Sequence, residues 1–171
     1  MINYVKGDAT QPIKRPALII HICNDIGKWG SGFVLSLRKH WPIAEASYRD
    51  WFKFHADHLE SATPFKLGEV QIVRVDTVGG DKTMWSDEAV YVANMIAQHN
   101  VKPYESIPLR LDALDKCLAE VARTVPVIHK DFSIHMPRIG TKRSGGRWVN
   151  IEPLIEKNLK DLEVYVYDFN E

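Results

Sequence analysis

The stretch ALIIHICNDIGKWGSGF, residues 17–33, decides how the chain is organised. Its first seven residues are almost all apolar, which is typical of a strand covered on both faces. The polar remainder carries three glycines and leads into a helical pattern. A plain turn would join a strand to a helix with fewer residues, so we interpret this first loop, residues 24–32, as backbone shaped around a ligand.

The size and composition predict a single domain over residues 1–171. The 171 residues, 45% of them hydrophobic, suffice for one core and are short for two domains. Lys plus Arg equals Asp plus Glu at 22 each, so no global charge favours nucleic acid or a membrane as partner. No secretory leader and no apolar run of about 20 residues is visible. We expect a monomer in the cytoplasm.

Alternating strand and helix patterns predict an α/β fold. Strand patterns cover residues 2–7, 17–23, 69–75, 89–97, 132–136 and 163–169. Helical patterns cover residues 33–41, 42–59, 105–124 and 150–162. The link at 76–88 has Gly79 and Gly80 and no helical period, which favours an antiparallel hairpin between its flanking strands. Together the patterns predict a three-layer α/β/α sandwich with a mixed, largely parallel central sheet.

A second polar loop, PRIGTKRSGGRW at residues 137–148, also lies between a strand and a helix. Its glycines allow backbone N–H groups to surround an anion, and the following helix adds the positive end of its dipole. Several cations add charge, and Gly30-Ser31-Gly32 opens the helix after the first loop in a similar way. Two such loops predict a clamp on a diphosphate, at the carboxyl ends of the strands.

Other polar residues near the strand ends suit the rest of a nucleotide-like ligand. Asn24 and Asp25 follow the second strand and can bond hydroxyl groups, while Trp29 can wall a sugar or stack on a ring. Asp8 follows the first strand and can accept a hydrogen bond from an exocyclic adenine amine. These positions predict an adenine site and a ribose site on either side of the clamp.

Three motifs in this order resemble a macrodomain, a family that binds ADP-ribose. They are VKGDAT at residues 5–10, HICNDIGKWGSGF at 21–33 and MPRIGTKRSGGRW at 136–148. The chain is most similar to the branch that holds the terminal ADP-ribose protein glycohydrolase and the ADP-ribose 1''-phosphate phosphatase. In that branch an MPxI loop ending in Trp and a terminal VY strand also occur.

The resemblance implies a ligand site along nearly the whole chain. Asp8 and Ala9 would hold the adenine, with Tyr167 and Phe169 beside it. From the second strand and the first loop it implies His21, Asn24, Gly27, Lys28, Trp29, Gly30, Ser31, Gly32 and Phe33. Farther along it implies Gln98, Pro137, Arg138, Ile139, Gly140, Thr141, Lys142, Arg143, Ser144, Gly145 and Gly146. The implied partner is ADP-ribose or a macromolecule that carries it, with no metal and no cofactor.

The catalytic residues of the related glycohydrolase are not matched. Its lysine follows the strand that here reads AVYVANMI, where this chain continues with AQHN, and its loop aspartate corresponds here to Ser144. A lysine adduct is therefore not expected. The remaining candidate catalytic residues are Asn24, Asp25, Ser144 and His99. Histidine side chains exchange protons near neutral pH, which makes His99 a candidate acid or base, and Asp25 a candidate for activating water.

Three hypotheses for the function stay open. The leading one is hydrolysis of an ADP-ribosyl ester, which removes ADP-ribose from a modified acidic side chain or from a nucleic-acid base or end. This reaction needs little more than an oriented water and stabilisation of developing charge. The second is phosphatase action on ADP-ribose 1''-phosphate. The third is a binding module that reads ADP-ribose without turnover. Sequence-specific nucleic-acid binding by residues 138–147 is not expected, because the net charge is zero and no aromatic residue is interleaved with these cations.

Overall fold

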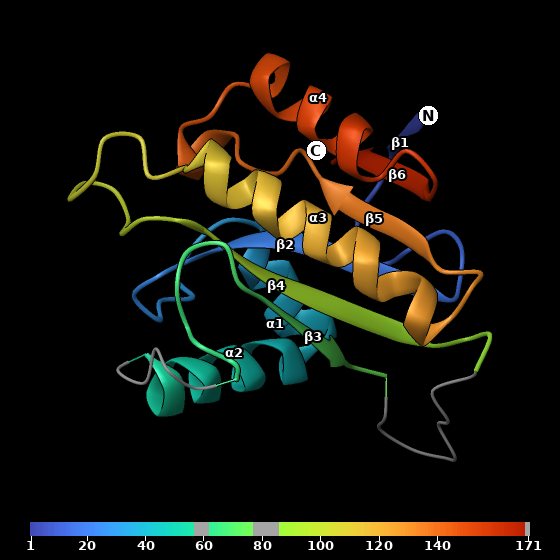
Figure 1. Ribbon diagram of the computed structural model, residues 1–171, viewed down its shortest axis with the longest axis horizontal. Coiled ribbons are helices and arrows are strands. Elements are labelled where there is room, and N and C mark those ends of the chain that lie inside the picture. Colours follow the sequence, from blue (N-terminus) through green and yellow to red (C-terminus); the bar gives the residue numbers. More distant parts are fainter. Residues whose placement is uncertain (57–61, 77–85, 170–171) are drawn as a thin grey trace.

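The computed structural model describes residues 1–56, 62–76 and 86–169, and Figure 1 shows their arrangement. One six-stranded sheet has the order β1-β6-β5-β2-β4-β3. Its strands are β1 (Ile2–Lys6), β2 (Ala17–Asn24), β3 (Val70–Arg74), β4 (Val90–Gln98), β5 (Ser133–Pro137) and β6 (Glu163–Asp168). The helices are α1 (Phe33–His40), α2 (Pro42–His55), α3 (Leu111–Ile128) and α4 (Trp148–Asn158). Within these described ranges, no helix has the length and apolar character needed to cross a membrane.

The sheet is mixed and largely parallel, as predicted. β1 runs parallel to β6, β6 to β5, β5 to β2 and β2 to β4, whereas β3 pairs with β4 in the antiparallel sense. The antiparallel pair confirms the predicted hairpin; Gly79 and Gly80 in its link lie outside the described residues. Because five strands run in one direction, their carboxyl ends meet at the same edge of the sheet.

The side chains of the central strands alternate between the two faces of the sheet. Leu18 and Ile20 of β2 belong to the core cluster packed against α3 and α4, whereas Ile19 belongs to the cluster packed against α1 and α2. Every residue of β4 is buried, as expected of a central strand covered on both faces. Figure 1 shows the two helix pairs on opposite sides of the sheet, which confirms the three-layer α/β/α sandwich.

The helix predicted over residues 105–124 begins later, at Leu111, and this part of the prediction was wrong. The residue before a proline avoids helical backbone, so Pro108 disfavours a helix start at residue 105. The segment before α3 instead runs beside the end of β4, where the Arg110 N–H donates to the Ala97 carbonyl at 2.9 Å. This difference matters for the site, because it leaves an irregular segment between β4 and α3.

The other helix boundaries agree more closely with the sequence patterns. Pro42 is the first residue of α2, the position that its fixed φ angle suits. The pattern predicted α2 as far as residue 59; the helix ends at His55, and residues 57–61 lie outside the described ranges. α4 begins at Trp148, two residues before the expected start at Asn150.

Candidate functional site

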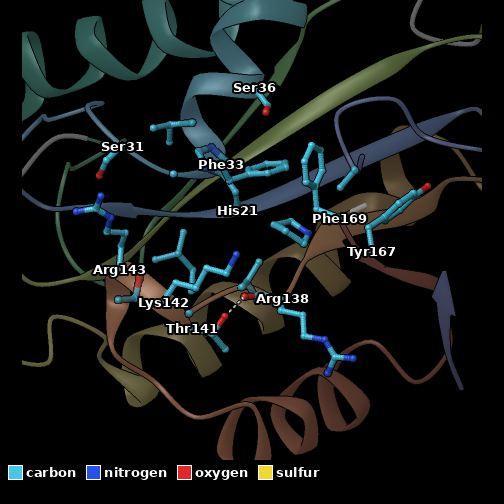
Figure 2. Close-up of a pocket in the computed structure, with 18 of the residues that line it drawn as sticks. His21, Ser31, Phe33, Ser36, Arg138, Thr141, Lys142, Arg143, Tyr167 and Phe169 are labelled. Atoms are coloured by element: carbon cyan, nitrogen blue, oxygen red, sulfur yellow. Dashed lines mark hydrogen bonds between the residues drawn. The ribbon is translucent and has the colours of Figure 1, made fainter. Parts of the chain in front are cut away.

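A cavity of about 550 Å³ opens at the sheet edge where the parallel strands end. Residues in or just after the carboxyl-terminal parts of β1, β2, β4, β5 and β6 line it, together with the start of α1. Figure 2 shows an elongated site, with Ser31 and Arg143 at one end and the rings of Tyr167 and Phe169 at the other. We call these the distal end and the aromatic end.

The two glycine loops lie opposite each other across this cavity. Gly32 has a φ angle of 78°, a left-handed conformation that favours glycine, and a Cβ added there would lie 3.9 Å from the Arg143 Cγ. Lys142 and Arg143 are exposed and line the cavity, and Figure 2 shows Lys142 extending toward its middle. Cationic side chains and closely approaching backbone make this region suited to an anion.

The second loop is wound tightly by its own backbone. The Gly146 N–H donates to the Gly140 carbonyl at 2.8 Å, and the Thr141 hydroxyl donates to the Arg138 carbonyl at 2.7 Å. A Cβ added at Gly146 would lie 2.6 Å from the Gly140 oxygen and 2.3 Å from the Leu109 Cδ2. Gly146 is not among the residues that line the cavity. It packs against Leu109 and the Gly140 backbone, and this close approach leaves no room for a side chain.

Asn24 organises the first loop from within. Its Nδ2 donates to the Lys28 carbonyl at 2.8 Å, while its Oδ1 accepts from the Ile26 N–H at 3.1 Å and the Lys28 N–H at 3.0 Å. The Tyr48 hydroxyl also donates to this oxygen at 2.9 Å. Both ends of the amide thus bond within the protein, and Asn24 lies outside the cavity lining.

Trp29 and Gly27 also face the protein interior. The Trp29 side chain is in the core beneath α1 and α2, with the residue 2% exposed, and its indole N–H donates to the Val34 carbonyl at 2.8 Å. It is not placed to stack on a ligand in the cavity, as the sequence pattern had suggested. Gly27 packs closely against Phe52 of α2, and a Cβ added there would lie 2.4 Å from the Phe52 ring.

At the aromatic end, Asp8 has one engaged oxygen. Its Oδ1 accepts from the Thr10 N–H at 2.8 Å and from the Thr10 hydroxyl at 2.7 Å. Its Oδ2 lies 3.9 Å from the His40 Nε2. These contacts hold the carboxylate in place and leave acceptor capacity on Oδ2 for a ligand.

Arg138 is neutralised within the protein. Its guanidinium bonds Asp168 at 2.7 Å, and this hydrogen bond raises the pKa of Arg138 and lowers the pKa of Asp168. The guanidinium also lies over the rings of Tyr4 and Trp148, at 4.9 Å and 5.1 Å from their centroids. Figure 2 shows the head group pointing away from the cavity, so Lys142 and Arg143 are the lining cations available to an anion.

A buried chain of hydrogen bonds supports the aromatic end. The Tyr167 hydroxyl accepts from the Ile13 N–H at 3.0 Å and lies 2.7 Å from the His135 Nδ1. The His135 Nε2 lies 2.7 Å from the Ser133 hydroxyl, which donates to the Pro16 carbonyl at 3.4 Å. Every group is satisfied when Tyr167 donates to Nδ1 and Nε2–H donates to Ser133. Burial lowers the pKa of His135 to about 4, so the ring is neutral at pH 7.

His21 forms a second buried, neutral support under the cavity. Its Nε2 lies 2.6 Å from the Asn94 Oδ1, whose amide group is oriented by donation to Gln71 and to the Ala44 carbonyl. The amide oxygen only accepts, so Nε2 carries the proton. Burial lowers the pKa of His21 to about 4.

Two side-chain pairs occur near the distal end. The Ser144 hydroxyl donates to the Gln98 Oε1 at 2.8 Å, and both residues line the cavity. Just beyond the lining, the His99 Nδ1 lies 2.7 Å from the Asp25 Oδ2, and the other Asp25 oxygen accepts from the Asn100 N–H at 2.8 Å. The His99 side chain is 48% exposed. The carboxylate fixes the imidazole orientation and leaves Nε2 open to solvent.

The structure gathers most of the predicted ligand-binding residues around one cavity. Its lining includes Asp8, Ala9, His21, Ser31, Gly32, Phe33, Gln98, Pro137, Arg138, Ile139, Gly140, Thr141, Lys142, Arg143, Ser144, Tyr167 and Phe169. Outside the lining lie Asn24, Asp25, Gly27, Lys28, Trp29, Gly30, His99, Gly145 and Gly146. Among the residues described, no group of three or more His, Cys, Asp or Glu side chains is arranged to hold a metal ion.

Sequence reasoning missed five lining residues, Gly7, Ile22, Val34, Ser36 and Asp168. Ser36 follows Gly32 by one helical turn, and this spacing could have placed it on the same face. Gly7 adjoins Asp8 and could have been included with it. Asp168 lies between Tyr167 and Phe169, which were both expected at the site, and could have been included with them.

No family model matches the chain. Among curated proteins it is 29% identical over 172 residues to the chromodomain-helicase-DNA-binding protein 1-like of Mus musculus, and 32% over 163 residues to that of Danio rerio. It covers 18% and 14% of the length of these two relatives. It is 40% identical over 174 residues to an ADP-ribose 1''-phosphate phosphatase of Saccharomyces cerevisiae, with 97% of each chain covered.

Solved structures show the same architecture. A Bacteroides thetaiotaomicron protein of unknown function matches with 43% identity and a TM-score of 0.80, over 98% of both chains. DarTG of Thermosipho africanus, solved in complex with ADP-ribose, shares the fold with a TM-score of 0.72 at 14% identity, over 99% of this chain and 41% of that one. A macrodomain protein of Streptomyces coelicolor matches with 40% identity and a TM-score of 0.78, over 99% of this chain and 100% of that one. With this similarity along its whole described fold, the chain belongs to the macrodomain family.

Proposed function

We propose that the cavity binds ADP-ribose. The single observation that carries this proposal is the pair of glycine loops that face each other across the cavity, with Gly32 opposite Arg143. A diphosphate between them meets backbone at close range and the cations Lys142 and Arg143. The adenine then lies at the aromatic end, where Asp8 can accept from its amine and Phe169 offers an exposed ring.

The distal ribose in this pose lies at the distal end, where a bond to its anomeric carbon can be broken. The ester hypothesis supplies water as the second reactant, so that the ribosyl ester gives ADP-ribose and a free carboxylic acid. The lining has two carboxylates, and both lie at the aromatic end: Asp8 follows β1, and Asp168 is the last residue of β6. A base at the distal end must therefore come from elsewhere in the chain or from the substrate's own phosphates.

We assign that role to His99, oriented by Asp25. The 2.7 Å contact between the carboxylate and Nδ1 orients the ring, and Nε2 is the nitrogen left to act as the base. His99 lies just beyond the lining, so this role requires a water between Nε2 and the distal ribose. His99→Ala and Asp25→Ala should each lower turnover by about 100-fold, the typical contribution of a general acid or base. Both variants should bind ADP-ribose as the parent does. Unchanged turnover in both would remove these residues from the mechanism.

The phosphatase reaction is the second candidate, and the similarity to the Saccharomyces cerevisiae protein favours it. One experiment separates the hypotheses. The full chain is incubated with a glutamate-ADP-ribosylated protein and, separately, with ADP-ribose 1''-phosphate, and the released ADP-ribose and phosphate are measured. Release from the protein supports ester hydrolysis, and release of phosphate supports the phosphatase. Binding of ADP-ribose without release from either substrate would make the chain a reader.

A further inference from the structure

The segment of residues 100–109, which we call the rim loop, borders the distal end of the cavity. It leaves β4 after His99, and the Leu109 N–H returns to donate to the Ser144 carbonyl at 3.0 Å. The rim loop also meets the first loop, since the Lys28 Nζ lies over the Tyr104 ring at 5.8 Å from its centroid. In Figure 1 this segment, between β4 and α3, extends away from the sheet. It therefore touches both glycine loops beside the proposed site of bond breakage.

The rim loop exposes apolar side chains at this position. Tyr104 is 74% exposed and Ile107 is 56% exposed, and the adjoining Leu111 at the start of α3 is 40% exposed. Pro108 and Leu109 of the same loop are buried and anchor it. Three large apolar side chains exposed within one short segment beside a binding site suit contact with a macromolecule.

The charge around the rim loop is positive. Lys28 and Lys102 are exposed, and Arg143 adds a third exposed cation at the distal end. Two nearby carboxylates are engaged, because Glu105 lies 3.4 Å from Arg110 and Asp25 pairs with His99. Asp112, in the first turn of α3, is exposed, so the cations outnumber the remaining carboxylate. A partner that meets this surface is complemented by acidic side chains.

We propose that the rim loop binds the polypeptide that carries the ADP-ribose, and that acidic residues flank the modified side chain. This inference rests on the proposed function, which brings the point of attachment to the distal end. The exposed surface combines one aromatic ring with the branched side chains of Ile107 and Leu111, which suits contact with peptide side chains. A single-stranded nucleic acid would call for several stacking rings along a basic groove.

The test uses peptides joined to ADP-ribose through glutamine, so that an amide replaces the ester and resists hydrolysis. The dissociation constant of the full chain is measured for free ADP-ribose, for a peptide with flanking glutamates and for one with flanking lysines. The parent should bind the acidic peptide about tenfold more tightly than free ADP-ribose, and the basic peptide less tightly than the acidic one. Added salt should reduce the difference between the peptides.

Variants assign the gain to the rim loop. In the double variant Tyr104→Ser, Ile107→Ser, the acidic peptide should bind little more tightly than free ADP-ribose. The affinity for free ADP-ribose itself should equal that of the parent. Lys102→Glu should weaken the binding of the acidic peptide and strengthen the binding of the basic peptide. Val127→Ser is the matched control, because Val127 is 77% exposed near the end of α3 and should behave as the parent.

Different failures have different meanings. A parent that binds ADP-ribose but gains nothing from either peptide, or a double variant that keeps the gain, would overturn the inference alone. A larger gain for an ADP-ribosylated oligonucleotide, lost in the double variant, would replace the polypeptide with nucleic acid. A parent that binds no ADP-ribose at all would overturn the proposed function.

Discussion

Gly30 and Gly32 stand two residues apart in the first loop, and their surroundings differ. Gly32 lines the cavity opposite Arg143 with a left-handed backbone, whereas a Cβ at Gly30 would meet nothing within 4 Å and Gly30 lies outside the lining. The sequence motif presents the two glycines as equivalent, and three-dimensional placement separates them. Both glycines are exposed, and only Gly32 lines the cavity.

This difference gives a prediction at the scale of one residue. Gly32→Glu should weaken ADP-ribose binding by at least about 100-fold, because it adds volume and negative charge where the diphosphate is expected. Gly30→Glu carries the same charge change into open space and should bind nearly as the parent does. Calorimetric titration measures both, with thermal unfolding as a check of the fold. Equal loss in both variants would contradict the assigned role of Gly32.

Asp8 gives a second prediction at this scale. Its Oδ1 is held by Thr10, so the substitution Asp8→Ala removes both a loop contact and the carboxylate proposed to meet the adenine amine. ADP-ribose binding should weaken by about tenfold, the typical value of one hydrogen bond to a charged group. Thr10→Val removes the hydroxyl contact and keeps the carboxylate, so it should cost less. Equal affinities for ADP-ribose in Asp8→Ala and the parent would remove Asp8 from the site.

At the scale of an element, the second loop depends on glycine behind the cavity. Gly146→Ala brings a Cβ within 2.6 Å of the Gly140 carbonyl oxygen, which is backbone and cannot move away alone. We expect a loss of about 1–3 kcal/mol in the free energy of unfolding, as for other overpacked sites, and weaker ADP-ribose binding. Gly30→Ala, in open space, should change the stability little. Urea unfolding measures the free energy of unfolding of both variants. A value for Gly146→Ala equal to that of the parent would contradict the predicted overpacking.

The elements also show what local patterns can and cannot predict. The apolar run of β2 and the alternation of β3 predicted strands in the right places. Burial on both faces leaves a continuous apolar run, and burial on one face leaves alternation. The start of α3 could not be predicted in the same way, since pairing with the end of β4 competes with helix formation. The engaged roles of Asn24 and Trp29 depend on α1 and α2, which fold against the loop from farther along the chain.

At the scale of the whole molecule, the buried histidines predict how stability depends on pH. Both His21 and His135 have a pKa of about 4 in the folded protein because burial disfavours the charged ring. In the unfolded chain, histidine takes up a proton below about pH 6.5. Between these values the unfolded state binds more protons, so stability is lost as the pH falls from about 6.5 to 4, by about 3 kcal/mol per histidine.

Urea unfolding between pH 7 and pH 5 measures this loss, in a range above the usual titration of carboxylates. Proton NMR of the two imidazole rings in the folded protein follows their titration directly. A free energy of unfolding that stays constant from pH 7 to pH 5 would contradict the neutral, buried state of both rings.

The measurement that tests the central claim most directly is calorimetric titration of the full chain with ADP-ribose, AMP and adenosine. If two glycine loops clamp the diphosphate, ADP-ribose binds with a stoichiometry of one and more tightly than AMP, and adenosine binds weakest. Equal affinity for all three ligands would contradict the clamp, and no heat with ADP-ribose would contradict the assignment of the cavity itself.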